Sequence, residues 1–171
     1  MHWQEVTLGK EVYEKYVVHI HDILNSDDLW IDRDDCKLHV EAQDDRTTRI
    51  HGCFTLQDSD AYMVFQNLYN TSIRKDVDST IVEFKTIEII DDWTDILYHH
   101  SAFPMNILNQ RDAVLWRHIF EIDKEKGIYT IIWLSCEHPD HPEKDGVVRI
   151  NSSGCYRVIQ QGEHVLSLIH I

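Results

Sequence analysis

Apolar residues follow a helical period in two parts of the chain and alternate with polar residues in most of the remainder. Residues 10–24 place apolar side chains close to a 3.6-residue period and predict an amphipathic helix. Residues 57–70 repeat that period, with Asp58 or Ser59 available as an N-cap. A short helix or turn is expected to follow through Arg74.

The alternating segments predict strands. Residues 37–41 alternate, and a turn at Asp44-Asp45 predicts a hairpin partner over residues 46–54. Further segments rich in β-branched and aromatic residues lie near 80–90, 94–102, 111–123, 127–137 and 146–160. A helix, a hairpin, two small helices and a long run of strands predict an α+β fold, with helices against one curved, mostly antiparallel sheet.

Composition narrows the class of protein. The 171 residues, of which 43% are hydrophobic, suit one globular domain. A net charge of −14, from 30 acidic and 16 basic residues, argues against nucleic acid as a partner, because phosphate binding depends on Lys and Arg. No apolar run approaches the roughly 20 residues that a membrane span needs, and the N-terminus lacks a signal-peptide pattern. We therefore expect a cytoplasmic protein with reduced cysteines.

No motif of catalysis or metal binding is present in the sequence. The cysteines form no CxxC pair, and the adjacent His99 and His100 would point to opposite faces of a strand. A nucleophile elbow, an HExxH motif and a Gly-rich phosphate loop are all missing. Ser135 and His138 could be imagined as a hydrolytic pair, but nothing supplies a third group. We predict no enzyme activity, no metal and no cofactor.

Four short motifs occur in order along the chain. They are Arg74–Asp78 (RKDVD), Phe103-Pro104-Met105, Arg111-Asp112 and Gly146–Arg149 (GVVR). Together they resemble the START domain, a lipid-transfer module, with Val77 in place of the usual Trp. The resemblance covers about Tyr13 to Val165. It implies a helix-grip fold of the START/Bet v 1-like type, with a curved sheet around a lipid tunnel, and it implies that Asp112 and Arg149 join strand ends to loops.

The resemblance also implies a head-group site. Arg74 and Asp78 have the spacing of an Arg–Asp pair in the phosphatidylcholine-transfer branch, where the Arg meets phosphate and the Asp orients it. From spacing alone, the same residues could be a solvated helical pair. Ala113, Leu115 and Arg117 alternate along one strand face, so Arg117 is expected to face the cavity. Its alternative is an edge position that reaches solvent.

Other positions bear on the kind of lipid. In sterol-binding members, the Arg that corresponds to Arg117 pairs with a carboxylate on the preceding strand, and His99 is the residue of this chain that aligns best with that carboxylate. His can offer only a neutral hydrogen bond there. Leu97 and Ala113 replace two aromatic residues of the choline cage. With Leu115 and Trp133 they are predicted to line the cavity. A phospholipid other than phosphatidylcholine is favoured, with a sterol or ceramide as an alternative.

We predict a START domain over residues 10–165 that encloses one lipid and contacts a membrane surface transiently. The last helix of the family is expected to be missing from this chain. Residues 166–171 (LSLIHI) match what a common sequencing adapter encodes, although a final strand is the alternative. Two other functions stay open: a regulatory lipid-sensing START domain of a RhoGAP or acyl-CoA thioesterase type, and a small-molecule enzyme on a Bet v 1-like scaffold.

Overall fold

The computed structural model of this chain describes residues 31–33, 36–42, 48–102 and 109–170. The helix predicted at residues 10–24 and the Phe103-Pro104-Met105 motif lie outside the described residues.

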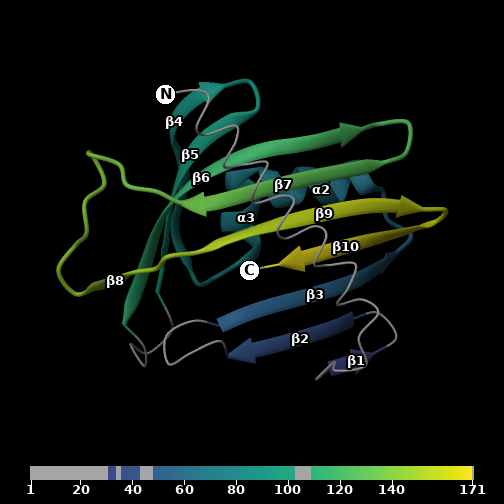
Figure 1. The fold of residues 1–171 in the computed structure, drawn as a ribbon, viewed down its shortest axis with the longest axis horizontal. Helices are drawn as coiled ribbons and strands as arrows, with labels where there is room; N and C mark the ends of the chain where they lie inside the picture. The colour runs from purple at the N-terminus through teal and green to yellow at the C-terminus, as the bar shows by residue number, and fades with distance from the viewer. Residues whose placement is uncertain (1–30, 34–35, 43–47, 103–108, 171) are drawn as a thin grey trace. The chain divides into compact units, whose positions relative to one another are not determined.

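Strands dominate the described part of the chain, and two short helices interrupt them (Figure 1). In chain order the elements are β1 (Ile31–Arg33), β2 (Cys36–Ala42), β3 (Thr48–Gln57), α2 (Ala61–Tyr69), α3 (Thr71–Val77), β4 (Ile81–Asp91), β5 (Thr94–Ser101), β6 (Gln110–Asp123), β7 (Ile128–Ser135), β8 (Val147–Arg149), β9 (Ser153–Gln161) and β10 (His164–His170). The predicted α+β class is confirmed. The sequence patterns missed β1, and the segment predicted at 146–160 is divided into β8 and β9.

Hydrogen bonds connect the strands in the order β1-β2-β3-β10-β9-β7-β6-β5-β4, with β8 beside β6. β8 pairs with β6 in parallel, whereas a meander would be antiparallel throughout. The difference arises because residues 136–146 make a long excursion between β7 and β8 (Figure 1). After this excursion β8 pairs with the start of β6 at Gln110–Asp112, and it does not form a hairpin with β7.

Residue contacts divide the chain into two compact units. Unit 1 comprises Met1–Phe65, Ile119–Ile132 and Gly154–Ile171, and unit 2 comprises Gln66–His118 and Trp133–Ser153. In unit 1 the predicted hairpin is confirmed, since β2 and β3 pair antiparallel from Cys36↔Phe54 to Ala42↔Thr48.

β10 forms the middle of unit 1, pairing with β3 on one side and β9 on the other. Val165 and Leu168 of this strand are buried together with Cys155 and Val158 of β9. The structure therefore agrees with a final strand at residues 164–170. An adapter origin of residues 166–171 stays a prediction.

The start of α2 is capped by a different residue than predicted. The backbone N–H of Met63 donates to Asp60 Oδ1 at 3.0 Å, so Asp60 is the N-cap. Asp58 has a positive φ of 49° instead. Ser59 uses its hydroxyl to donate to the Gln57 carbonyl. The prediction of Asp58 or Ser59 as the cap was wrong, because the tight turn before α2 delays the helix.

Unit 2 contains the β4-β5-β6 part of the sheet and the short helix α3, which packs against β4. β5 is buried on both of its faces, with Leu97 on one and Tyr98 on the other. α3 begins at Asn70, whose Oδ1 accepts hydrogen bonds from the backbone N–H groups of Ser72 and Ile73. The short helix or turn that the sequence predicted through Arg74 is therefore confirmed as α3.

Candidate functional site

The candidate site is one face of the β5–β6 pair. Three successive cross-strand pairs on this face are Asp95↔Arg117, Leu97↔Leu115 and His99↔Ala113. They lie two residues apart along each strand, so their side chains point the same way. Leu97 and Ala113 are only 2% and 4% exposed, and Leu115 is half-buried. The structure thus brings four predicted site residues together on this face, beside Arg117.

Arg117 forms a buried ion pair with Asp95. Its Nε donates to Asp95 Oδ1 at 2.9 Å, and its Nη2 donates to Asp95 Oδ2 at 2.6 Å. The two residues are 5% and 6% exposed. The partner predicted from the sequence, His99, instead lies opposite Ala113. The prediction that His99 lies opposite Arg117 was therefore wrong, and the solvent-facing alternative for Arg117 is also excluded.

The end of α2 also contacts Arg117. Arg117 Nη1 donates to the backbone carbonyl of Tyr69 at 2.6 Å, and the guanidinium carbon lies 4.0 Å from the centre of the Tyr69 ring. Thr86 Oγ1 donates to Asp95 Oδ2 at 3.1 Å. Within the part of the chain that the structure describes, one N–H on each of Nη1 and Nη2 remains for another acceptor.

Arg74, Asp78 and His99 are close enough to interact electrostatically. Hydrogen bonds from the Thr80 hydroxyl (2.7 Å) and backbone N–H (3.0 Å) lower the pKa of the Asp78 carboxyl, and the charge of Arg74 lowers it further. Burial lowers the pKa of His99, although Asp78 opposes that shift. The direction of this shift favours the neutral imidazole form of His99. Asp78 is oriented mainly by Thr80, and Arg74 contributes only through its charge.

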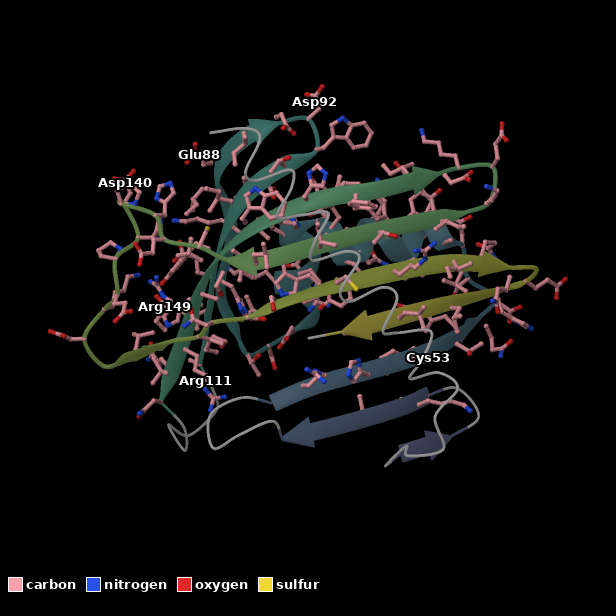
Figure 2. All side chains as sticks on the ribbon, in the orientation of Figure 1. Cys53, Glu88, Asp92, Arg111, Asp140 and Arg149 are labelled. Carbon is pink, nitrogen blue, oxygen red and sulfur yellow. The ribbon has the colours of Figure 1, made fainter. Side chains whose placement is uncertain are left out.

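A second polar network lies on the opposite face of the same strands and joins them to the loop before β8. Asp112 accepts from Arg149 Nε at 2.7 Å, from Arg149 Nη2 at 3.1 Å and from the Tyr98 hydroxyl at 3.1 Å. Arg149 Nη2 also donates to the carbonyls of His141 and Pro142. Figure 2 shows Asp140 in this loop, Arg149 on β8 and Glu88 on β4. The predicted joining role of Asp112 and Arg149 is confirmed.

Three further residues have clear positions in the structure. Trp133 is buried and donates from Nε1 to the Ser152 hydroxyl at 3.2 Å. Trp93 is 50% exposed at the turn before β5. Ser135 accepts from the Ser152 backbone N–H at 2.7 Å, which makes it part of a strand junction.

His138 is hydrogen-bonded to Glu88 of β4, with 3.2 Å between Nε2 and Oε2. Among the residues that the structure describes, no group of three or more His, Cys, Asp or Glu side chains is arranged to hold a metal ion. Within the same residues, no helix is both long and apolar enough to cross a membrane.

The START domain family matches residues 46–170 of this sequence. The chain belongs to the START domain family. START domains bind lipids. The fold is the helix-grip fold with a large antiparallel sheet, and no helix follows β10 in the described part of the chain. A comparison with curated proteins gives no match.

Solved structures share this START fold. Human StAR-related lipid transfer protein 5 superposes with a TM-score of 0.82 at 15% identity, covering 100% of this chain and 82% of its own. Human STARD10 gives 0.76 at 21% identity, covering 89% of this chain and 63% of its own. The lipid transfer and protein localization domain of human StarD13 (DLC2) gives a TM-score of 0.67 at 21% identity, and the match covers 99% of this chain and 82% of the StarD13 chain. The chain thus spans less than two thirds of STARD10, and these identities establish the fold alone.

Sequence reasoning missed two residues of the candidate site, Asp95 and Tyr69. Asp95 follows Asp91 and Asp92 closely, and alternation alone does not say which Asp lies opposite Arg117. That choice depends on the register between β5 and β6, in which Asp95 lies opposite Arg117. Tyr69 contacts Arg117 across 48 positions of sequence, so no local pattern marks it.

Proposed function

We propose that this START domain binds a single lipid, with the apolar part of the lipid on the β5–β6 face and its polar end at Asp95 and Arg117. The observation that carries the proposal is a buried ion pair beside Leu97, Leu115 and Ala113. Burying two charges costs several kcal/mol per ion, and well-packed apolar residues often serve stability as well or better. A polar ligand group gives such a pair a function.

The affinity would come mainly from the apolar part of the lipid, at about 0.8 kcal/mol for each buried CH2. The polar groups would then choose the head. The proposed setting is an internal tunnel, as the family resemblance implies, in a cytoplasmic protein that contacts membranes transiently. Within the described part of the chain, the cysteines at positions 36, 53, 136 and 155 form no disulfide.

A phospholipid is the finer form of the proposal. Its phosphate would meet the Arg74 guanidinium, which can donate several hydrogen bonds to phosphate oxygens. The Asp78 carboxylate accepts hydrogen bonds from Thr80 and not from Arg74, so the Arg74 guanidinium can still donate to a phosphate. Arg117 would then donate to an ester carbonyl. The resemblance to the phosphatidylcholine-transfer branch supports this form, whereas Leu97 and Ala113 argue against a choline head.

A second candidate is a neutral lipid that carries a hydroxyl group, such as a sterol or a ceramide. Asp95 neutralises Arg117, so the pair offers both a donor and an acceptor to a hydroxyl and has little attraction for a second anion. This observation favours the neutral lipid at Arg117 specifically. Asp95 also supplies the carboxylate partner of Arg117 that the sequence alignment, which placed His99 there, had left missing.

Lipid binding without catalysis is proposed in both cases. Ser135 and His138, considered above as a hydrolytic pair, are bonded to Ser152 and Glu88 respectively. Whether the lipid is carried or sensed belongs to the whole protein. A lipid-sensing module of a longer protein, of the RhoGAP or acyl-CoA thioesterase type, is the alternative to a carrier.

Native mass spectrometry with offered lipids tests the proposal. The protein is incubated with vesicles containing dioleoyl phosphatidylcholine, dioleoyl phosphatidylethanolamine, cholesterol or C16 ceramide, and bound lipid is counted per chain. Phospholipid bound one per chain and lost in Arg74→Ala supports the phospholipid form. Cholesterol or ceramide that is bound by Arg74→Ala but lost in Arg117→Met supports the neutral form. A folded protein that takes up none of the four would overturn the proposal.

A further inference from the structure

Tyr69 contacts the Arg117 guanidinium in two ways. Its backbone carbonyl accepts a hydrogen bond from Nη1 at 2.6 Å, and its ring lies against the guanidinium with the Cζ atom 4.0 Å from the ring centre. Asp95 holds a different edge of the same group through Nε and Nη2. One edge, one terminal nitrogen and one face of the guanidinium are therefore occupied.

The helix junction explains why the Tyr69 carbonyl is directed at Arg117. In a continuous helix this carbonyl would accept from the backbone N–H four residues later, at Ile73. Here Asn70 separates α2 from α3, and the Ile73 N–H donates to Asn70 Oδ1 at 3.3 Å instead. The carbonyl at the end of α2 is thereby released from the helical pattern. A cation is well placed at that end, where the helix dipole is negative.

We propose that Tyr69 is a positioning residue, which fixes the plane of the Arg117 guanidinium and so determines which lipid head the domain prefers. The hydrogen bonds to Asp95 and to the Tyr69 carbonyl hold N–H groups at the edges of the guanidinium and still allow it to tilt out of its plane. The Tyr69 ring blocks that tilt and adds a cation–π attraction. The remaining N–H groups on Nη1 and Nη2 then point in fixed directions within one plane.

This arrangement has a consequence for selectivity. A lipid oxygen accepts from Arg117 in the plane of the guanidinium, where the N–H groups point, and the Tyr69 ring lies against one face. Lipids that present an acceptor oxygen there gain a hydrogen bond to a charged donor. Lipids without that oxygen leave a buried N–H unsatisfied, which costs more than the bond itself is worth. The inference rests on the proposed function, since it concerns the preference of the same site.

Matched lipid pairs measure this preference in the full chain. One pair is cholesterol and its 3-deoxy analogue, and the other is dioleoyl phosphatidylcholine and its diether analogue without ester carbonyls. We expect the protein to prefer the oxygen-bearing member of one pair by about tenfold, the effect of one hydrogen bond to a charged group. Tyr69→Leu should reduce this preference to less than about threefold, whereas Tyr69→Phe, which keeps the ring, should retain it.

Arginine side-chain NMR on the lipid-free protein gives an independent readout. With ¹⁵N-labelled arginine, the Nη signals of Arg117 should be separate when the ring hinders rotation, and they should merge in Tyr69→Leu. Tyr62→Leu is the matched control, because Tyr62 lies on the same helix and is 46% exposed. It should change neither the NMR signals nor the lipid preference. Thermal unfolding of each variant identifies a loss of fold.

The outcomes separate the inference from the function on which it rests. A lipid preference that survives in folded Tyr69→Leu, with unchanged Arg117 signals, overturns the role of Tyr69 and leaves lipid binding intact. Equal loss of preference in Tyr69→Phe and Tyr69→Leu also overturns it, because the ring is then not the cause. Failure of the unaltered protein to bind any member of either pair overturns the proposed function itself.

Discussion

The buried pair of Asp95 and Arg117 gives a prediction whose size follows from the structure. Replacing Asp95 by Asn leaves the Arg117 charge buried without a counter-ion. Both residues are almost fully buried, at 6% and 5% exposed. Breaking such a pair from one side is expected to lower the free energy of unfolding by about 3–5 kcal/mol. Arg117→Met should cost a similar amount, because the Asp95 carboxylate is then isolated.

The double variant Asp95→Asn/Arg117→Met should behave differently. It removes both charges and recovers their desolvation cost, which is often worth about 1–4 kcal/mol. Against this gain, Tyr69 loses a donor to its carbonyl, and each lost hydrogen bond costs about 1 kcal/mol. We expect the double variant to lie within about 2 kcal/mol of the unaltered protein. The two substitutions should therefore be strongly non-additive.

Urea unfolding monitored by tryptophan fluorescence provides the assay, and the four proteins form a double-mutant cycle. The matched control is the exposed Lys85–Glu83 pair, which is 2.8 Å apart with side chains 48% and 39% exposed. Glu83→Gln should change the stability by at most about 1 kcal/mol. Additive losses in the cycle, or a loss in Asp95→Asn as small as in the control, would refute the reasoning. Lipid uptake by a stable double variant would show that the pair is needed neither for stability nor for lipid binding.

Three further predictions concern other parts of the chain. Burial lowers the pKa of His141, so the contribution of this residue to stability should fall as the pH drops below about 6.5, where the unfolded chain takes up the proton first. Urea unfolding at pH 7.5 and 5.5 should therefore show less acid sensitivity in His141→Phe than in the unaltered protein, and equal sensitivity would contradict this. Gly127→Ala should lower the free energy of unfolding by more than about 1 kcal/mol, because φ is +63° and a Cβ would lie 2.6 Å from the Gln160 Cβ. Gly162→Ala, at φ +64° in open space, is the control, and an equal loss of stability there would show that the Gln160 contact is not the cause. Asn70→Ala removes the cap of α3 and should cost about 1 kcal/mol, measured as a fall in Tm, whereas an unchanged Tm would mean that the cap is replaced by solvent.

Much of the fold could be predicted from local patterns. Alternation marked the strand that became β2, and β-branched and aromatic content marked those that became β4, β5, β6 and β7. Helix positions were also predicted, although the start of α2 shifted to Asp60. The parallel pairing of β8 with β6 was not predictable, because it depends on where a long loop returns and not on the three residues of the strand.

The candidate site was predicted only in part, and the reason is the same. Alternation placed Ala113, Leu115 and Arg117 on one face, and the structure has them so. The partner of Arg117 required the register between two strands, and a difference of four residues separates His99 from Asp95. Tyr69 reaches Arg117 only because the chain bends between α2 and α3, which brings the helix end to the sheet.

The sequence by itself determined the α+β class, the START resemblance and the face of β6 that carries Arg117. Each of these depends on side chains that are close in sequence, where chain geometry leaves few alternatives. Tertiary structure alone decided that Asp95 neutralises Arg117 and that Tyr69 holds its plane. Those contacts join positions 22 and 48 residues apart, and the folding of the whole domain, not local propensity, determines which distant groups meet.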